Sequence, residues 1–178
     1  MAKKLLLQAL AQYEKSSLAL PEEAETIKRF VRFVQETPDC FGRPAGGHVT
    51  SSAWIVDHTG TKALLTHHRK LNRWLQLGGH NDGDSDCAAV AVKEGWEESG
   101  IEGLKLFKPE IFDIDIHPLP NACAFHYDVR YILQAPEGAK YVISDESHDL
   151  AWVPVREVQN FSKQRSVLRM QEKWLDLF

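Results

Sequence analysis

The sequence lacks the usual marks of a secreted or membrane-bound protein. Its three cysteines, Cys40, Cys87 and Cys123, are widely spaced and form no C-x-x-C pair, so we predict reduced thiols and neither a disulfide framework nor a zinc knuckle. No run approaches the roughly 20 apolar residues that cross a bilayer. The lysine-containing start is interrupted by Gln8 and Gln12 and lacks a small-residue cleavage site. These absences predict a cytoplasmic chain with no membrane partner.

An excess of basic residues is also missing. Lys and Arg number 21 against 25 Asp and Glu, which gives a formal charge of -4 at pH 7. General binding of nucleic acid relies on clustered Lys and Arg, so no nucleic-acid partner is predicted. With 178 residues, of which 43% are hydrophobic, the chain is long enough to build one compact core.

Two helices are predicted over residues 3 to 37, the second of which opens after Pro21. Its apolar residues recur at helical spacing and are Ile27, Phe30, Val31 and Val34. We interpret residues 1–45 as a helical extension packed on the same domain, and residues 46–178 as the main domain. The extension carries no pattern that indicates chemistry, and a homodimer formed through it is left open.

The main domain groups its strands together. Strand-like runs are HVTSSAWIVD, KALLTHH, RWLQL, IFDIDIH, AFHYDVRYIL and LAWVP, and helices are predicted near residues 86–99 and 162–177. Helices separate the strands only occasionally, unlike in a regularly alternating parallel fold. The predicted fold class is therefore α/β of the α+β type, with a mixed sheet between helices in an α/β/α sandwich.

Three glutamates share one face of the helix predicted near residues 86–99. Glu94, Glu97 and Glu98 stand at positions i, i+3 and i+4, where like charges repel and where the negative end of the helix dipole disfavours them. A divalent cation would remove both penalties, and carboxylate oxygens suit Mg²⁺ or Mn²⁺. The alternative is a solvated acidic helix face.

The surroundings of these glutamates favour a binding site. Gly78 and Gly79 follow an apolar strand and form a predicted glycine loop, where the backbone can approach a ligand closely. The helix also has an apolar side for packing, made of Ala88, Val90, Ala91 and Val92. Lys93 is placed to orient the carboxylate of Glu94.

The stretch LQLGGHNDGDSDCAAVAVKEGWEESGI resembles the Nudix box, written G-x5-E-x7-R-E-U-x-E-E-x-G-U with U an aliphatic residue. Starting at Gly79, the pattern is met at Glu94, Glu97, Glu98, Gly100 and Ile101. Three positions depart from it: Ser85 replaces a glutamate, Lys93 an arginine and Gly95 the aliphatic residue. Lysine keeps the charge but loses the planar fork of arginine. Asp84 or Asp86, on either side of Ser85, is available to supply the missing acid.

The resemblance covers roughly residues 48 to 158 and implies a chemistry. It implies hydrolysis of the diphosphate linkage in a nucleoside diphosphate joined to another group, by attack of water on phosphorus. The implied cofactor is Mg²⁺ or Mn²⁺, held by Glu94, Glu97, Glu98 and the carbonyl of Gly79 or Gly78. The base that takes the proton of water is a box glutamate or an acid in a later loop, for which Glu146 is our candidate, although an acidic surface turn explains it as well.

Several basic side chains are candidates for binding a nucleotide-type substrate. Arg69 and Arg73 lie in a basic run before the glycines, although a solvated charge run is equally consistent with them. His80 follows Gly79 and contacts phosphate or ends a turn. We predict no zinc at His80, because no second histidine stands at ligand spacing.

His126 and Arg130 are further candidates, if the two strands around residues 119–122 pair. They would then share one sheet face with Asp113, Asp115, His117 and Asp128. The alternative for this polar face is the solvent-exposed side of an antiparallel sheet.

Two other functions compete with hydrolysis. A nucleotide-binding or regulatory module of weak activity would explain Ser85, Lys93 and Gly95, whereas the intact glutamate trio argues for a metal enzyme. An isomerase acting on a diphosphate would need a cysteine facing the substrate, and Cys87 lies within the box helix. Sugar nucleotides, ADP-ribose, dinucleotide polyphosphates and nucleoside triphosphates all remain open as substrates.

Overall fold

The computed structural model describes residues 2–44, 46–119 and 124–177. The chain opens with the two predicted helices, α1 (Ala2–Glu14) and α2 (Ala24–Glu36), and a short 3-10 turn, η1 (Pro21–Glu23), precedes α2. Cys123 and residues 120–122 of the turn between the two predicted strands lie outside the described residues, whereas Cys40 and Cys87 are free thiols, as predicted.

The strands form one mixed sheet in the described part of the chain, which confirms the predicted fold class. They are β1 (Gly47–Val56), β2 (Lys62–His68), β3 (Arg73–Leu75), β4 (Leu77–His80), β5 (Lys105–Leu106), β6 (Asp113–Pro118), β7 (Phe125–Gln134) and β8 (Ser147–Pro154). The central strand β1 pairs in parallel with β7 and antiparallel with β2 and β4. Strand β6 is antiparallel to β7, and β8 to β2.

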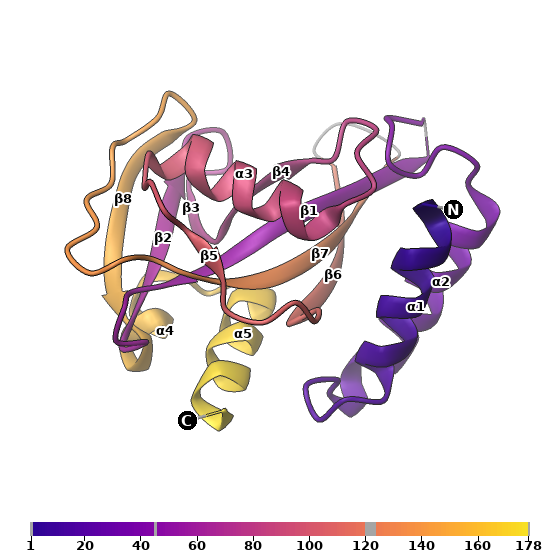
Figure 1. Ribbon diagram of the computed structural model, residues 1–178, viewed down its shortest axis with the longest axis horizontal. Coiled ribbons are helices and arrows are strands. Elements are labelled where there is room, and N and C mark those ends of the chain that lie inside the picture. The colour runs from indigo at the N-terminus through magenta and orange to yellow at the C-terminus, as the bar shows by residue number, and fades with distance from the viewer. Residues whose placement is uncertain (1, 45, 120–123, 178) are drawn as a thin grey trace.

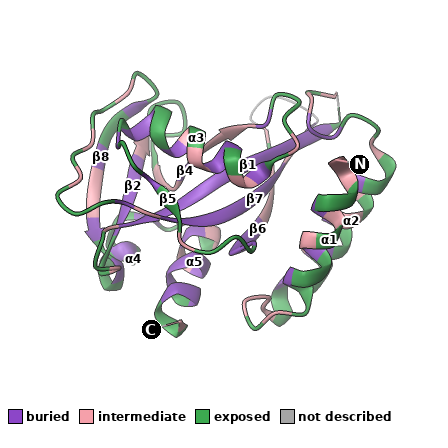
Figure 2. Cartoon of the chain, in the orientation of Figure 1, coloured by how far each residue is buried: buried purple, intermediate pink, exposed green. Residues whose placement is uncertain are grey.

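Helices cover both faces of this sheet, with α3 (Cys87–Ser99) on one face and α5 (Arg165–Asp176) on the other (Figure 1). A 3-10 turn, η2 (Val155–Glu157), and the short helix α4 (Val158–Phe161) connect β8 to α5. Every residue of β1 is buried, as the unbroken purple ribbon in Figure 2 shows, because its side chains alternate between two covered faces. No helix in the described ranges is long and apolar enough to span a membrane.

The N-terminal helices share the core of the main domain. Leu10 and Phe30 belong to one buried cluster with Val49 of β1 and Val129 of β7. Phe33 of α2 stacks on Tyr127 with the ring centroids 3.7 Å apart. In Figure 1 the helix pair lies beside β6, at one end of the sheet.

The two glycines predicted to form a loop instead belong to strand β4. Gly79 pairs with Ser51 and Gly78 with Ser52 of β1. Glycine is depleted in strands, so the prediction of a loop followed from composition and was wrong. The missing side chains serve close packing, because a Cβ atom on Gly78 would overlap the side chain of Ser52.

The polar face shared by β6 and β7 is buried around Asp113 and Arg130 and partly exposed around His117. The register pairs Asp113 with Arg130, Asp115 with Asp128 and His117 with His126, so these side chains do share one face. The alternative of a solvated face was wrong for Asp113 and Arg130, which are 0% and 1% exposed, whereas the side chain of His117 is 41% exposed. The sequence of the strands alone does not reveal that α5 covers this face.

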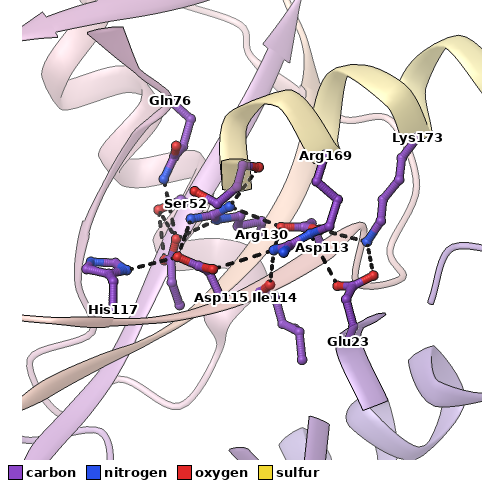
Figure 3. Close-up of polar contacts among 12 residues, drawn as sticks. Glu23, Ser52, Gln76, Asp113, Ile114, Asp115, His117, Arg130, Arg169 and Lys173 are labelled. Carbon is purple, nitrogen blue, oxygen red and sulfur yellow. Dashed lines mark hydrogen bonds and ion pairs between the residues drawn. The ribbon is translucent and has the colours of Figure 1, made fainter. Parts of the chain in front are cut away.

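A network of ion pairs makes this burial possible (Figure 3). The guanidinium of Arg130 lies 2.7 Å from Asp128 and 3.0 Å from Asp113, and contacts Asp115 at 3.4 Å. Arg169 of α5 donates two hydrogen bonds to Asp113, at 2.8 and 2.9 Å.

The same network reaches the N-terminal segment. The ammonium of Lys173 lies 2.6 Å from Asp113 and 2.7 Å from Glu23 in η1. The hydroxyl of Tyr13 donates to Glu23 at 2.7 Å and accepts from Lys173. Residues from the start, middle and end of the chain therefore meet in one buried cluster.

Candidate functional site

Helix α3 is held at both ends by local interactions. Asp86 caps its start, because the Asp86 carboxylate accepts a hydrogen bond from the Ala89 N–H at 3.0 Å. Gly100 ends it in the left-handed conformation, with φ of 66°. The helix that carries Glu94, Glu97 and Glu98 is thus fixed in length and position against the sheet.

The glycines of β4 bring two of the glutamates against the strand backbone. The N–H of Gly78 donates to the carboxylate of Glu98 at 3.0 Å. A Cβ atom on Gly79 would overlap the Glu94 carboxylate. Only a residue without a side chain at Gly79 allows Glu94 to lie there, which places the Gly79 backbone beside a carboxylate.

Burial raises the pKa of two of these carboxylates, because the nearby positive charge does not offset the loss of solvent. Burial, opposed by the hydrogen bond from Gly78 and aided by the charges of Glu146 and Glu94, raises the pKa of Glu98 to about 8. Burial likewise raises the pKa of Glu94, although the ammonium of Lys93 opposes it.

The third glutamate is turned toward a lysine. Lys93 lies 3.3 Å from Glu97 and 3.5 Å from Glu94, and its side chain is 60% exposed. In the described residues the three glutamates do not form a group whose ligand atoms converge closely enough to hold a metal ion. Mutual repulsion, the Gly78 N–H and Lys93 hold them apart.

Glu146 lies near the same two buried carboxylates. It is exposed in the loop before β8, and its charge contributes to the raised pKa of both Glu94 and Glu98. Its carbonyl accepts a hydrogen bond from the backbone N–H of Arg69 at 2.9 Å. The loop after β2 and the loop before β8 therefore meet beside the glutamates.

Comparison with known families identifies this arrangement. The sequence profile of the NUDIX domain matches residues 46–174. The chain belongs to the Nudix hydrolase family. No curated protein is similar enough in sequence to count as a match.

Solved Nudix structures share the fold at low sequence identity. A NUDIX family hydrolase from Clostridium perfringens is 23% identical, with a TM-score of 0.62 over 73% of this chain and 97% of that one. An Ap4A hydrolase from C. elegans is 15% identical, with a TM-score of 0.64 over 72% and 96%. The E. coli dihydroneopterin triphosphate pyrophosphohydrolase is 14% identical, with a TM-score of 0.59 over 73% and 96%.

The departure of this Nudix box at Gly95 has a packing reason. A Cβ atom on Gly95 would lie 3.1 Å from a methyl group of Leu133 and 3.3 Å from methyl groups of Ile55 and Leu104. These three side chains already fill the space between α3 and the sheet. The aliphatic contact expected from the box position is therefore supplied by the neighbours of Gly95.

The departure at Ser85 leaves two flanking aspartates with local roles. Asp86 is the cap of α3, and the carboxylate of Asp84 accepts a hydrogen bond from the Asp86 N–H at 2.9 Å. Both aspartates thus organise the turn that enters the Nudix helix.

The basic candidates for substrate binding are placed differently from one another. Arg69 is exposed beside the Glu146 loop, where it donates to the carbonyl of Ser147 at 3.0 Å. Arg73 is exposed and donates to Gln164 at 3.2 Å. Arg130 is enclosed by carboxylates and is not free to bind phosphate in this arrangement.

The sequence did not indicate a histidine cluster on the face of the sheet that α5 covers. His80 lies beside His48 and His126, which come from β1 and β7. Burial lowers the pKa of all three, that of His126 to about 3, so the rings are neutral at pH 7. No second histidine stands at ligand spacing from His80 in the sequence, but strand pairing brings two distant histidines beside it.

Cys87 is not placed for covalent chemistry. Its side chain is buried, and burial raises the pKa of the thiol to about 11. A thiol in this state is a poor nucleophile at neutral pH. The isomerase alternative therefore has no support from this residue.

Proposed function

We propose that the chain hydrolyses the diphosphate linkage of a nucleoside diphosphate joined to another group, with Mg²⁺ or Mn²⁺ as cofactor. The observation that supports this is the position of Glu98. Its carboxylate is 8% exposed and meets a backbone N–H of β4, yet no cationic side chain pairs with it among the described residues. Buried charges that are not paired are costly, which is expected of a group that binds a cation.

The donor set fits a hard divalent cation. Glu94, Glu97 and Glu98, together with the carbonyl of Gly79, would hold it through oxygen atoms alone, as Mg²⁺ and Mn²⁺ prefer. Such an ion supplies charge neutralisation for the diphosphate and lowers the pKa of a bound water. The raised pKa values of Glu94 and Glu98 have the sign expected where positive charge is missing.

The protein side chains supply the remaining steps. Glu146 is our candidate to accept the proton of the attacking water at a carboxylate oxygen. Arg69, Arg73 and His80 are our candidates to bind and orient the phosphates, since all three lie on segments that adjoin β4 or the Glu146 loop. Catalysis would then consist of positioning the water and the diphosphate and of neutralising the charge on the phosphates.

Formation of a nucleoside monophosphate, followed with a coupled monophosphate or pyrophosphate readout, tests this function. The full chain is incubated with a panel of nucleoside diphosphate derivatives, a dinucleoside polyphosphate and nucleoside triphosphates, with Mg²⁺, Mn²⁺ or a chelator. The panel includes the last two classes because similar structures are named as an Ap4A hydrolase and a triphosphate pyrophosphohydrolase. We expect turnover of one class, only with metal.

Matched variants make the test specific. Glu98→Gln should lower kcat at least about 100-fold, because several kcal/mol of charge stabilisation depend on the metal. Glu146→Gln should lower kcat about 100-fold or more if Glu146 is the base. Glu102→Gln, an exposed position just beyond α3, should leave turnover unchanged. No turnover of any compound, with nucleotide binding still detectable, would instead support the regulatory module.

A further inference from the structure

Three histidines converge on the sheet face that points away from α3. His48 of β1, His80 of β4 and His126 of β7 each offer a ring nitrogen, and these nitrogens all lie within 4.8 Å of one another. The ring centroids are 4.7 to 5.1 Å apart. No other group of three or more His, Cys, Asp or Glu side chains within residues 2–44, 46–119 and 124–177 converges as closely.

Strand register produces this cluster. His48 is the direct partner of His126 in the parallel pair of β1 and β7. His80 pairs with Thr50, two residues further along β1, and residues two apart on a strand point to the same face. The three rings therefore stand in one row across adjacent strands.

Two ring nitrogens in the cluster are buried without a partner. Nε2 of His48 and Nε2 of His126 make no hydrogen bond within the part of the chain that the structure describes. Buried polar atoms normally have a hydrogen-bond partner, so two unpaired ring nitrogens in one cluster are expected to bind a ligand. Both belong to rings that face the same small space.

A chain of hydrogen bonds links Asp115, His117 and His126. The carboxylate of Asp115 only accepts, so Nδ1 of His117 donates to it at 3.3 Å. Nε2 of His117 and Nδ1 of His126 are 3.2 Å apart, so Nδ1 of His126 is placed to donate to His117. Nε2 of His126 is left with a free lone pair, as a metal ligand requires.

We propose that His48, His80 and His126 bind a transition-metal cation, Zn²⁺ in particular, and that His117 and Asp115 orient His126 from behind. Imidazole nitrogens suit Zn²⁺, whereas they are poor ligands for Mg²⁺. Three protein ligands leave a fourth tetrahedral position open, as in catalytic zinc sites. A histidine ligand commonly has its second nitrogen bound to a carboxylate, a carbonyl or another acceptor.

The geometry requires only small side-chain movements. Zn–N bonds of about 2.0–2.1 Å place the nitrogens of a tetrahedral site about 3.4 Å apart. The ring nitrogens lie within 4.8 Å of one another, so ring rotations that move each nitrogen by about 1 Å bring them to this separation. The nearby guanidinium of Arg43 would repel a cation, but Asp82 neutralises it through two contacts at 2.6 and 3.0 Å. The histidines lie on the sheet face opposite the glutamates of α3, and only His80 also has a part in the proposed function, so Zn²⁺ binding without substrate tests this site by itself.

Metal binding by the full chain, without any substrate, tests the proposal. Chelator-treated protein is titrated with Zn²⁺ alone, and bound metal is counted after dialysis. We expect one equivalent, and we expect long-range 1H–15N spectra to show shifts of the ring nitrogens of His48, His80 and His126. The spectra are needed because the buried thiols of Cys40 and Cys87 also belong to a class of zinc ligands.

A graded series of variants sharpens the result. His126→Ala should weaken Zn²⁺ binding at least about 100-fold, since it removes a ligand. His117→Phe, which removes only the orienting contact, should weaken it about 10–100-fold. His58→Ala, at an exposed turn outside the cluster, should leave the affinity unchanged. If the buried position of His48 prevents His48→Ala from folding, the less buried His80→Ala gives the same test.

The proposal is overturned by three results. Wild-type protein that binds Zn²⁺ no tighter than the millimolar range would show that the cluster is not a metal site. If the His126→Ala and His80→Ala variants retain as much Zn²⁺ as the wild type, the metal binds elsewhere. Unchanged ring resonances of the three histidines in the zinc-loaded protein would do the same.

Discussion

The buried network around Asp113 and the glutamates of α3 both bring carboxylates together, but they differ in how the charge is compensated. Asp113 is surrounded by Arg130, Arg169 and Lys173 within 3.0 Å. Glu98 is nearly as buried, and within the described residues its carboxylate has only a backbone N–H as a partner. The difference indicates that the first group stabilises the fold, whereas the second group is left to bind something.

The pKa shifts of the two groups have opposite signs. Burial alone would raise the pKa of Asp113, but the hydrogen bond from Arg169 and the charges of Arg130 and Lys173 hold that pKa below its usual range. At Glu98 burial prevails and the pKa rises to about 8. Equal burial therefore has opposite consequences, according to whether cations are present.

Replacing Lys173 tests how much the ion pairs around Asp113 contribute to stability. Lys173→Met keeps most of the side-chain volume but leaves Glu23 without its ammonium partner and weakens the set around Asp113. We expect the free energy of unfolding in urea to fall by about 3–5 kcal/mol, as for other buried pairs that lose one member. A loss below about 1 kcal/mol would show that the network contributes little to stability.

The pH dependence of stability tests whether Glu98 is buried without a cationic partner. A carboxyl group whose folded pKa is raised above its unfolded value binds its proton more tightly in the folded state, so stability falls as pH rises between the two values. With chelator present, we expect the contribution of Glu98 to the free energy of unfolding to fall by about 4 kcal/mol between pH 4.5 and 8. The window follows from the shift from 4.5 to about 8.

The Glu98→Gln variant is the control for this pH effect. It lacks the titrating group, so the fall between pH 4.5 and 8 should be smaller by the contribution of Glu98. Adding Mg²⁺ at pH 8 should raise the melting temperature of the wild type but not of the variant, because ligand binding stabilises the folded state. Identical pH profiles for the two proteins would contradict the assignment.

Lys93 gives the smallest expected effect and is the matched counterpart of Lys173. Each lysine contacts two carboxylates, but the side chain of Lys93 is 60% exposed and that of Lys173 is 2% exposed. Lys93→Met should therefore change the free energy of unfolding by less than about 1 kcal/mol. A loss as large as that in Lys173→Met would remove the distinction between exposed and buried pairs.

Local periodicity was enough to predict the helix and its carboxylates. The i, i+3, i+4 spacing of Glu94, Glu97 and Glu98 fixes one helix face without reference to the rest of the chain. Asp86 and Gly100 likewise define the ends of α3 through interactions within a few residues. The family resemblance rested on this same local pattern, and the NUDIX profile match confirms it.

Features that depend on contacts between distant segments could not be predicted in this way. The histidine cluster requires the register of β1 with β7 and with β4, which no local pattern of the sequence contains. Burial of Arg130 requires α5 to cover the face of β6 and β7. Only the arrangement of the whole sheet supplies that information.

The contact between Glu23 and Lys173 joins positions separated by 150 residues. During synthesis, Lys173 leaves the ribosome only after every strand of the sheet has been made. Until then Glu23 and Tyr13 lack the ammonium group that they contact in the folded protein, so we expect docking of the N-terminal helix pair to be completed only after α5 has left the ribosome. Nascent chains stalled before α5 should then be cleaved by protease in the helix pair, whereas early protection would show that docking precedes the arrival of Lys173.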